Sequence, residues 1–148
     1  MIKLGIRILP HFKGLPLPAY QSAQAAGMDI AAAVWDTVLL PPGGRALIPS
    51  GMVIELPAGY EAQIRPRSGL ALKRGISIIN TPCTIDSDYR GEIRIPLINF
   101  DREPQEIAHG ERIAQMLIAQ VIRIEWEPAD ELPPTGRGSG GFGSTGRH

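Results

Sequence analysis

The stretch N-T-P-C-T-I-D-S-D-Y-R-G, from Asn80 to Gly91, lies in the middle of the chain and is unusually rich in polar side chains. Its first three residues are typical of a turn. Asp86, Asp88 and Tyr89 follow close together. A strand does not need such polar density at its entrance in order to fold. The stretch is either an acidic turn before a strand or a catalytic loop, and the rest of the chain must decide between them.

Apolar and polar residues alternate on both sides of this stretch. Residues 92–97 predict a strand with isoleucine and leucine on one face and Glu92 and Arg94 on the other. Residues 2–8 alternate in the same way and predict a half-buried strand, and residues 60–65 predict another. We expect residues 76–80 and 85–89 to pair as a hairpin whose tip exposes backbone donors and acceptors.

Glycine and proline are frequent: the chain of 148 residues contains 17 glycines and 14 prolines. Such frequent turn residues leave room mainly for short strands, so the sequence predicts an all-β protein of one domain. The one helix we expect is about two turns long, with Ser68 as its N-cap and Gly75 at its end. Arg67 beside Ser68 suits a phosphate, although an ordinary capped helix would also explain Ser68.

Residues 111–127 contain neither glycine nor proline and are rich in β-branched side chains. We therefore expect a long strand that is buried on both faces rather than a helix. Gln115 and Gln120 lie within it. A buried amide without a partner costs on the order of 1–3 kcal/mol, so both side chains are expected to find hydrogen-bond partners.

The overall composition excludes several classes of function. Lys and Arg number 15, as do Asp and Glu, so no global field attracts the protein to nucleic acid or to an anionic membrane. The single cysteine excludes a disulfide framework and favours a reducing, cytoplasmic setting. We expect no signal peptide, because Lys3 and Arg7 interrupt the apolar run at the N-terminus, and no apolar run is long enough to span a membrane.

Two further stretches allow both an ordinary and a functional interpretation. Asp29 could satisfy a turn amide, or it could orient the water ligands of a metal ion. The last fourteen residues are rich in glycine and could form a disordered tail. They could instead form an arm whose amides, hydroxyls and arginines wrap a phosphate while Phe142 stacks on a planar ring.

Taken together and in this order, the pieces resemble the five motifs of the trimeric dUTPases. The matching segments cover nearly the whole chain and read A-G-M-D-I, P-R-S-G-L-A, N-T-P-C-T-I-D-S-D-Y-R-G, G-E-R-I-A-Q-M and R-G-S-G-G-F-G-S-T-G. The resemblance implies a jelly-roll-like β-barrel or sandwich and a homotrimer with active sites shared between subunits. It also implies Mg²⁺-assisted hydrolysis of dUTP to dUMP and pyrophosphate. Such an enzyme limits uracil incorporation into DNA and supplies dUMP for thymidylate synthesis.

The resemblance also assigns roles to single residues. Asp86 would be the general base, Asp29 would hold waters of the Mg²⁺ ion, and Tyr89 would pack against the deoxyribose. The other residues implied to contact the substrate are Arg67, Ser68, Gly69, Asn80, Thr84, Ile85, Gln115, Arg137, Phe142, Gly143, Ser144 and Thr145. Residues 1–134 would form the β domain, and residues 135–148 would form a C-terminal arm that closes over the site.

One residue departs from the family pattern, because Cys83 stands where these enzymes usually have glycine. If the position needs a positive φ or a close approach to the nucleotide, the side chain costs about 1 kcal/mol and weakens binding. Two rival functions also stay open: a dCTP deaminase, which would need a catalytic glutamate in the pocket, and a nucleotide sensor without catalysis. Ammonia release from dCTP identifies the first, and the absence of pyrophosphate release identifies the second.

Overall fold

The structure is a computed structural model and describes residues 2–141. In these residues the chain forms short strands, one 3-10 helix η1 (Pro10–Phe12) and one α-helix α1 (Ser68–Arg74). The strands are β1 (Gly5–Ile8), β2 (Met28–Ala31), β3 (Val38–Leu40), β4 (Arg45–Pro49), β5 (Met52–Glu55), β6 (Tyr60–Arg65), β7 (Ile76–Ile78), β8 (Cys83–Ile85), β9 (Arg94–Asn99), β10 (Gln105–Ile107) and β11 (Arg112–Gln120). The prediction of an all-β fold with one short helix is confirmed.

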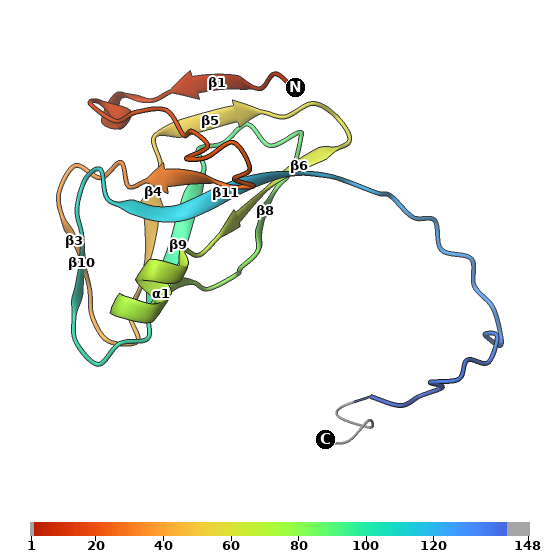
Figure 1. The fold of residues 1–148 in the computed structure, drawn as a ribbon. Helices are drawn as coiled ribbons and strands as arrows, with labels where there is room; N and C mark the ends of the chain where they lie inside the picture. Colours follow the sequence, from red (N-terminus) through yellow and green to blue (C-terminus); the bar gives the residue numbers. More distant parts are fainter. Residues whose placement is uncertain (1, 142–148) are drawn as a thin grey trace.

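Two antiparallel sheets enclose the core (Figure 1). One sheet has the strand order β2-β11-β6-β8, and the other has the order β4-β9-β7. Both contribute fully buried residues to a single hydrophobic cluster, such as Ile64 and Ile113 from the first sheet and Ile95 and Leu97 from the second. The pairs β1-β5 and β3-β10 complete this jelly-roll-like sandwich.

The alternation in residues 92–97 is confirmed, because Ile93, Ile95 and Leu97 are all completely buried in or beside β9. The N-terminal strand differs from the prediction. It covers only Gly5–Ile8 and is exposed along its whole length, with Ile6 42% accessible. It pairs only with β5, and the part of the chain that the structure describes leaves its aliphatic side chains uncovered.

The predicted hairpin of residues 76–80 and 85–89 is wrong. Strand β7 pairs with β9 in the three-stranded sheet, and β8 pairs with β6 in the four-stranded sheet. The segment between them therefore crosses from one sheet to the other, with a cis peptide bond between Thr81 and Pro82. Neighbouring strands in a sandwich can each find a better partner elsewhere in the chain, which local pattern does not reveal.

The helix ends as predicted but begins differently. Gly75 adopts the left-handed conformation with φ 60° and ends α1. A Cβ at this position would lie 2.7 Å from the backbone nitrogen of Asp101, so space as well as φ requires glycine. The N-cap is Arg67 rather than Ser68, and no side chain caps the first turn. Ser68 is instead the first residue of the helix.

The long strand predicted for residues 111–127 is shorter in the structure. Strand β11 ends at Gln120, and residues 121–141 contain no strand or helix and extend away from the body (Figure 1). Ile122 and Trp126 are 89% and 85% exposed, so the predicted burial of this part is wrong for the single chain. The division at residue 134 stays a prediction. In residues 2–141 no helix is long and apolar enough to cross a membrane.

Candidate active site

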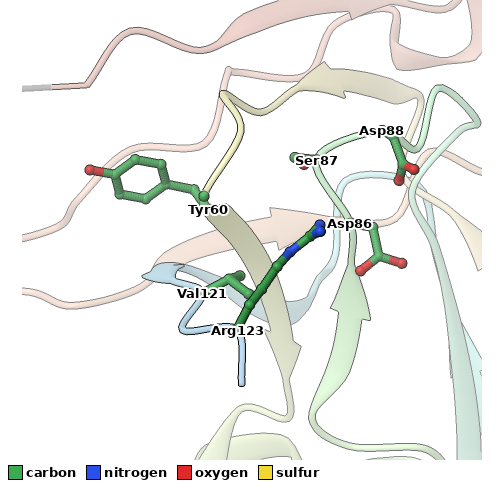
Figure 2. A pocket seen from close by; sticks show the side chains of 7 residues that line it. Tyr60, Asp86, Ser87, Asp88, Val121 and Arg123 are labelled. Atoms are coloured by element: carbon green, nitrogen blue, oxygen red, sulfur yellow. The ribbon is translucent and has the colours of Figure 1, made fainter. Parts of the chain in front are cut away.

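Asp86 lies directly after β8, at the start of a turn. It lines a surface hollow of about 330 Å³, whose other lining residues are Gly59, Tyr60, Ser87, Asp88, Val121 and Arg123. Figure 2 shows that Arg123 reaches from the segment after β11 toward the turn that carries Asp86. The side chain of Asp86 is exposed. Its carboxylate is therefore accessible both to water and to a ligand in the hollow.

Strand β8, which leads to Asp86, is the outer strand of its sheet. Cys83 and Ile85 point into the core, and Thr84 between them is exposed. One edge of β8 pairs with β6, and no strand of residues 2–141 pairs with the other edge. An unpaired edge offers backbone donors and acceptors. Ile85 can therefore contact a ligand through its backbone, since its side chain is buried.

Cys83 occupies an extended strand position, opposite Ile64 on β6. The backbone strain that we considered for this position does not arise, because the conformation suits any residue. The side chain is 9% exposed and belongs to the hydrophobic core. It reaches the wall of a second hollow, so a close approach to a ligand stays the only reason for Cys83 to affect binding.

This second hollow, of about 550 Å³, lies beside the loop after β8. Tyr89 forms part of its wall, and its hydroxyl donates to the carbonyl oxygen of Glu92 at 3.1 Å. A Cβ on Gly91 would lie 2.2 Å from that hydroxyl oxygen. The phenol ring therefore folds over a residue that must have no side chain. The other lining residues are Leu47, Cys83, Ile85, Gly91, Glu92 and Arg94.

Glu92 holds this loop to the N-terminal segment. Its side chain, 8% exposed, accepts from His11 at 2.5 Å, from the Gly51 amide at 2.9 Å and from Arg94 at 2.9 Å. Burial by itself raises the pKa of the Glu92 carboxyl, but the bonds from His11, Arg94 and Gly51 outweigh it and leave the pKa below its ordinary value. Glu92 is therefore an ionised structural residue beneath the loop.

A second group of predicted residues surrounds Asp29 on β2. Arg67 donates from Nε to Asp29 Oδ1 at 2.8 Å, and Arg112 donates from Nη1 to Asp29 Oδ2 at 3.1 Å. Arg67 also donates from Nη1 to the carbonyl oxygen of Arg112 at 3.0 Å. Both oxygens of the carboxylate are thus engaged by guanidinium groups, and the cluster of two cations and one anion keeps an excess positive charge.

Gln115 lies opposite Asp29 across the β2-β11 pair. Its amide nitrogen donates to the carbonyl oxygen of Pro66 at 2.9 Å, so it fixes the backbone just before Arg67. Gln120, the other amide of the strand, donates to the Tyr60 hydroxyl at 3.4 Å. The expectation that both amides find partners is confirmed. One donor of the Gln115 amide is therefore used by the protein, and its predicted contact with the substrate stays a prediction.

The remaining predicted contacts divide between the two groups. Ser68 and Gly69 open α1 next to Arg67 and are exposed, and Asn80 is exposed in the segment that precedes β8. None of the residues that line the Asp86 hollow belongs to the Asp29 group. The single chain therefore presents the predicted residues as two separate groups rather than as one site.

The described part of the predicted arm, residues 135–141, contributes to neither group. Arg137 is exposed and donates from Nε to the carbonyl oxygen of Gly140 at 2.7 Å, in the segment that extends away from the body (Figure 1). Phe142, Gly143, Ser144 and Thr145 lie outside the described residues. Their predicted contacts stay predictions.

Two basic residues were missed from the sequence alone. Arg112 belongs to the Asp29 cluster, and Arg123 lines the hollow of Asp86. The arginine within the fourth motif was a visible signal for Arg112. Arg123 had no such signal, because it was assigned to a strand that the chain does not form there. In residues 2–141 no three His, Cys, Asp or Glu side chains come together in a way that could hold a metal ion.

Comparison with known proteins gives a consistent assignment. The dUTPase family model matches residues 13–146. The deoxyuridine 5'-triphosphate nucleotidohydrolases of Methylocella silvestris and Maricaulis maris are both 56% identical over 147 residues, covering 98% of this chain and 92% and 97% of theirs. A variant of the dUTPase of Staphylococcus bacteriophage 80alpha, solved with dUpNHpp, has a TM-score of 0.83 at 26% identity and covers 99% of each chain.

A dUTPase variant from phage phi11 of S. aureus, described with a structural Mg(II) ion, is 23% identical to this chain and has a TM-score of 0.78. The match covers 90% of this chain and 100% of the phage protein, and at this identity it shows the shared fold alone. The family model and the two bacterial relatives span nearly the whole chain, including both residue groups described above. This chain belongs to the dUTPase family.

Proposed function

We propose that this chain, a dUTP diphosphatase by family, hydrolyses dUTP to dUMP and pyrophosphate with Asp86 as the general base. The observation that carries the proposal is the exposed carboxylate of Asp86 at the end of β8, whose outer edge is unpaired within residues 2–141, in a chain 56% identical to curated dUTP nucleotidohydrolases. Through this reaction the enzyme would limit uracil incorporation into DNA and supply dUMP for thymidylate synthesis.

Hydrolysis requires a water molecule in line with the bond that breaks and donors that neutralise the developing charge. Asp86 takes a proton from this water, whose oxygen attacks the α-phosphorus. The bond from the α-phosphorus to the bridging oxygen breaks, and pyrophosphate leaves. No covalent intermediate is needed, because the activated water is itself the nucleophile.

Base selection would depend on the free edge of β8. Backbone groups near Thr84 and Ile85, together with Asn80, would read the uracil edge, where donors and acceptors are exchanged relative to cytosine. Tyr89 would pack against the deoxyribose from the second hollow. The Tyr89 ring lies over Gly91 and is held by its hydroxyl bond to Glu92, so it would not move aside for the 2′-hydroxyl group of a ribonucleotide.

The Asp29 group suits Mg²⁺ only together with the triphosphate. Each oxygen of Asp29 accepts one guanidinium donor, and a carboxylate oxygen has a second lone pair for a metal-bound water. Mg²⁺ commonly binds through substrate phosphates, few carboxylates and several waters. When bound, the ion would neutralise charge on the phosphates, while Arg67, Ser68 and Gly69 would hold phosphate oxygens.

A homotrimer with shared active sites would join the two residue groups that one chain keeps apart. The exposed apolar residues after Gln120, among them Ile122 and Trp126, support burial against other subunits. The arm would then bring Arg137, Phe142 and the residues after it to a neighbour's nucleotide. A cytoplasmic location without nucleic-acid or membrane partners is part of the same proposal and rests on charge balance and the lone cysteine.

The test is pyrophosphate release from dUTP with Mg²⁺ by the wild type and by Asp86→Asn. We expect the variant to bind a non-hydrolysable analogue normally and to lose turnover by about 10²–10⁴-fold, the usual contribution of a general base. Turnover near the wild-type level would exclude Asp86 as the base. A wild type that releases ammonia from dCTP instead would identify a deaminase.

Loss of the arm is the second test. A chain that stops before Arg137 should keep the folded trimer, measured by light scattering and circular dichroism, and should lose most of its activity. Failure to fold would show that the arm is a structural element, and full activity would exclude its role as a lid.

A further inference from the structure

We propose that Arg112 is a further phosphate-binding residue and that Asp29 is a positioning residue that aims Arg67 and Arg112 as a two-arginine fork. This inference rests on the proposed function and concerns the same substrate. It gives Asp29 a role that does not depend on a metal ion. Arg67 and Arg112 come from distant parts of the chain and meet at one carboxylate.

The hydrogen bonds of the cluster leave the outer donors of both arginines available. Arg67 uses Nε for Asp29 and Nη1 for the Arg112 carbonyl, and Arg112 uses Nη1 for Asp29. Nη2 of Arg67 and both Nε and Nη2 of Arg112 have no acceptor within residues 2–141. The side chain of Arg112 is 57% exposed and that of Arg67 is 28% exposed, so these donors face outward.

The charges of the cluster favour an anion. Asp29, 19% exposed, is its only carboxylate, and the nearest acidic residue in sequence, Glu111, forms an ion pair with Arg74 instead. Two guanidinium groups that share one carboxylate repel each other and retain a net positive charge. A phosphate that accepts from both removes this repulsion, because planar guanidinium groups match phosphate oxygens in pairs.

A register shift in β11 brings Arg112 to this face. Arg112 lies opposite Ala31, Ala114 opposite Ile30 and Gln115 opposite Asp29, so the pairing with β2 slips between Arg112 and Ala114. In a regular strand, residues 112 and 115 would point to opposite faces. Both residues act on the Asp29 group, through Asp29 itself and through Pro66. Bulges near active sites often redirect a side chain in this way.

Neighbouring residues hold the fork in place. Gln115 binds the Pro66 carbonyl at 2.9 Å and so fixes the backbone that leads into Arg67. Gly27 lies against Gln115, because a Cβ there would be 2.8 Å from the amide oxygen Oε1. Asp29 then fixes the guanidinium groups themselves. The arrangement is the kind of supported site in which donors are oriented before the ligand arrives.

The test measures the affinity of purified trimer for the α,β-imido analogue of dUTP by titration calorimetry, once in EDTA and once with Mg²⁺. Arg112→Gln should weaken binding by about tenfold in both buffers, the loss expected for one charge-assisted contact. Binding of dUMP should change less than twofold, because the fork would hold the outer phosphates. Arg102→Gln, an exposed arginine in the loop after β9, is the matched control and should bind like the wild type.

Asp29→Asn separates the two roles of Asp29. If it aims the arginines, the variant binds the analogue about tenfold more weakly in EDTA as well as in Mg²⁺. If it acts only on the metal, binding in EDTA is unchanged and only the Mg²⁺ requirement rises, which overturns the positioning role. Arg112→Lys should not restore affinity, because lysine cannot bind Asp29 and a phosphate in the same plane.

Two outcomes distinguish this inference from the proposed function. If the wild type hydrolyses dUTP but Arg112→Gln binds the analogue normally in EDTA, the fork is wrong and the proposed function stands. If the wild type does not hydrolyse dUTP, the proposed function itself fails. Thermal unfolding of each variant confirms that lost affinity is not lost structure, and Arg112 is exposed enough for its replacement to leave the fold intact.

Discussion

The sharpest prediction about the fold concerns Gly51, the residue just before β5. Its φ is +70°, and a Cβ there would lie 2.8 Å from Phe12 Cβ, 3.0 Å from Phe12 Cα and 3.1 Å from Ala33 Cβ. Phe12 is 6% exposed and packs in the core, so it cannot move away without opening a gap. Gly51→Ala should therefore destabilise the protein in two ways, through its backbone conformation and through overpacking.

Gly43 provides a control that separates the two contributions. Its φ is +69°, almost the same, but a Cβ there would have no neighbour within 4 Å. Gly43→Ala should cost only the backbone part, about 1 kcal/mol. Gly51→Ala should cost that amount plus about 1–3 kcal/mol for overpacking, so about 2–4 kcal/mol in total. A chain of this size loses about 3 °C of melting temperature per kcal/mol, so the melting temperature should fall by roughly 3 °C in Gly43→Ala and by roughly 6–12 °C in Gly51→Ala.

Thermal unfolding followed by circular dichroism measures both variants, at one protein concentration because the assembly affects the midpoint. Equal losses for the two variants would refute the packing argument, since the added Cβ meets Phe12 and Ala33 only at Gly51. A loss in Gly51→Ala alone would refute the backbone argument.

Three further changes test other parts of the structure. Gly91→Ala should push the Tyr89 ring off its place over the loop, raising KM for dUTP several-fold and increasing the turnover of UTP relative to dUTP in steady-state assays. The pKa of Glu92 is lower in the folded than in the unfolded protein, so its ionised form stabilises the fold above the unfolded value of 4.5, and this contribution is lost as the pH falls through the folded pKa. The difference in unfolding free energy between wild type and Glu92→Gln, measured in urea titrations, should therefore be largest at neutral pH and shrink below pH 4.5. Arg74→Ala leaves Glu111 without its ion-pair partner and should lower the free energy of unfolding by about 1–3 kcal/mol, measured in urea.

Each of these has an outcome that would contradict it. A Gly91→Ala variant that still discriminates against UTP like the wild type would show that Tyr89 does not guard the sugar. A pH-independent difference for Glu92→Gln would show that its ionised form is not favoured by folding. An Arg74→Ala variant as stable as the wild type would show that the ion pair with Glu111 contributes nothing measurable.

Much of the fold was predictable from local pattern. The alternation around Ile93, Ile95 and Leu97 placed a buried face correctly, and Gly75 marked the end of the helix. Frequent glycine and proline indicated the all-β class. These features depend on the period of the strand and on the backbone conformations of single residues, which are properties of a short segment.

The errors lie where a segment's partner is distant in the chain. Strands β7 and β8 are neighbours in sequence but belong to different sheets, because β9 and β6 are their partners. The apolar run after Gln120 has the composition of a buried strand, yet nothing in residues 2–141 covers it. Composition reports that a segment needs burial but not which surface buries it.

For the candidate site, the sequence alone determined which residue types are present and in which order: Asp29, Arg67, Asp86 and Gln115 stand in the pattern of five motifs. Only the tertiary structure decided that Asp29 holds two arginines and that Arg112 is one of them. The reason is the slip in register between β11 and β2, which turns Arg112 to the same side as Gln115. A strand of period two predicts the opposite, because the extra residue of a bulge exists only in relation to the partner strand.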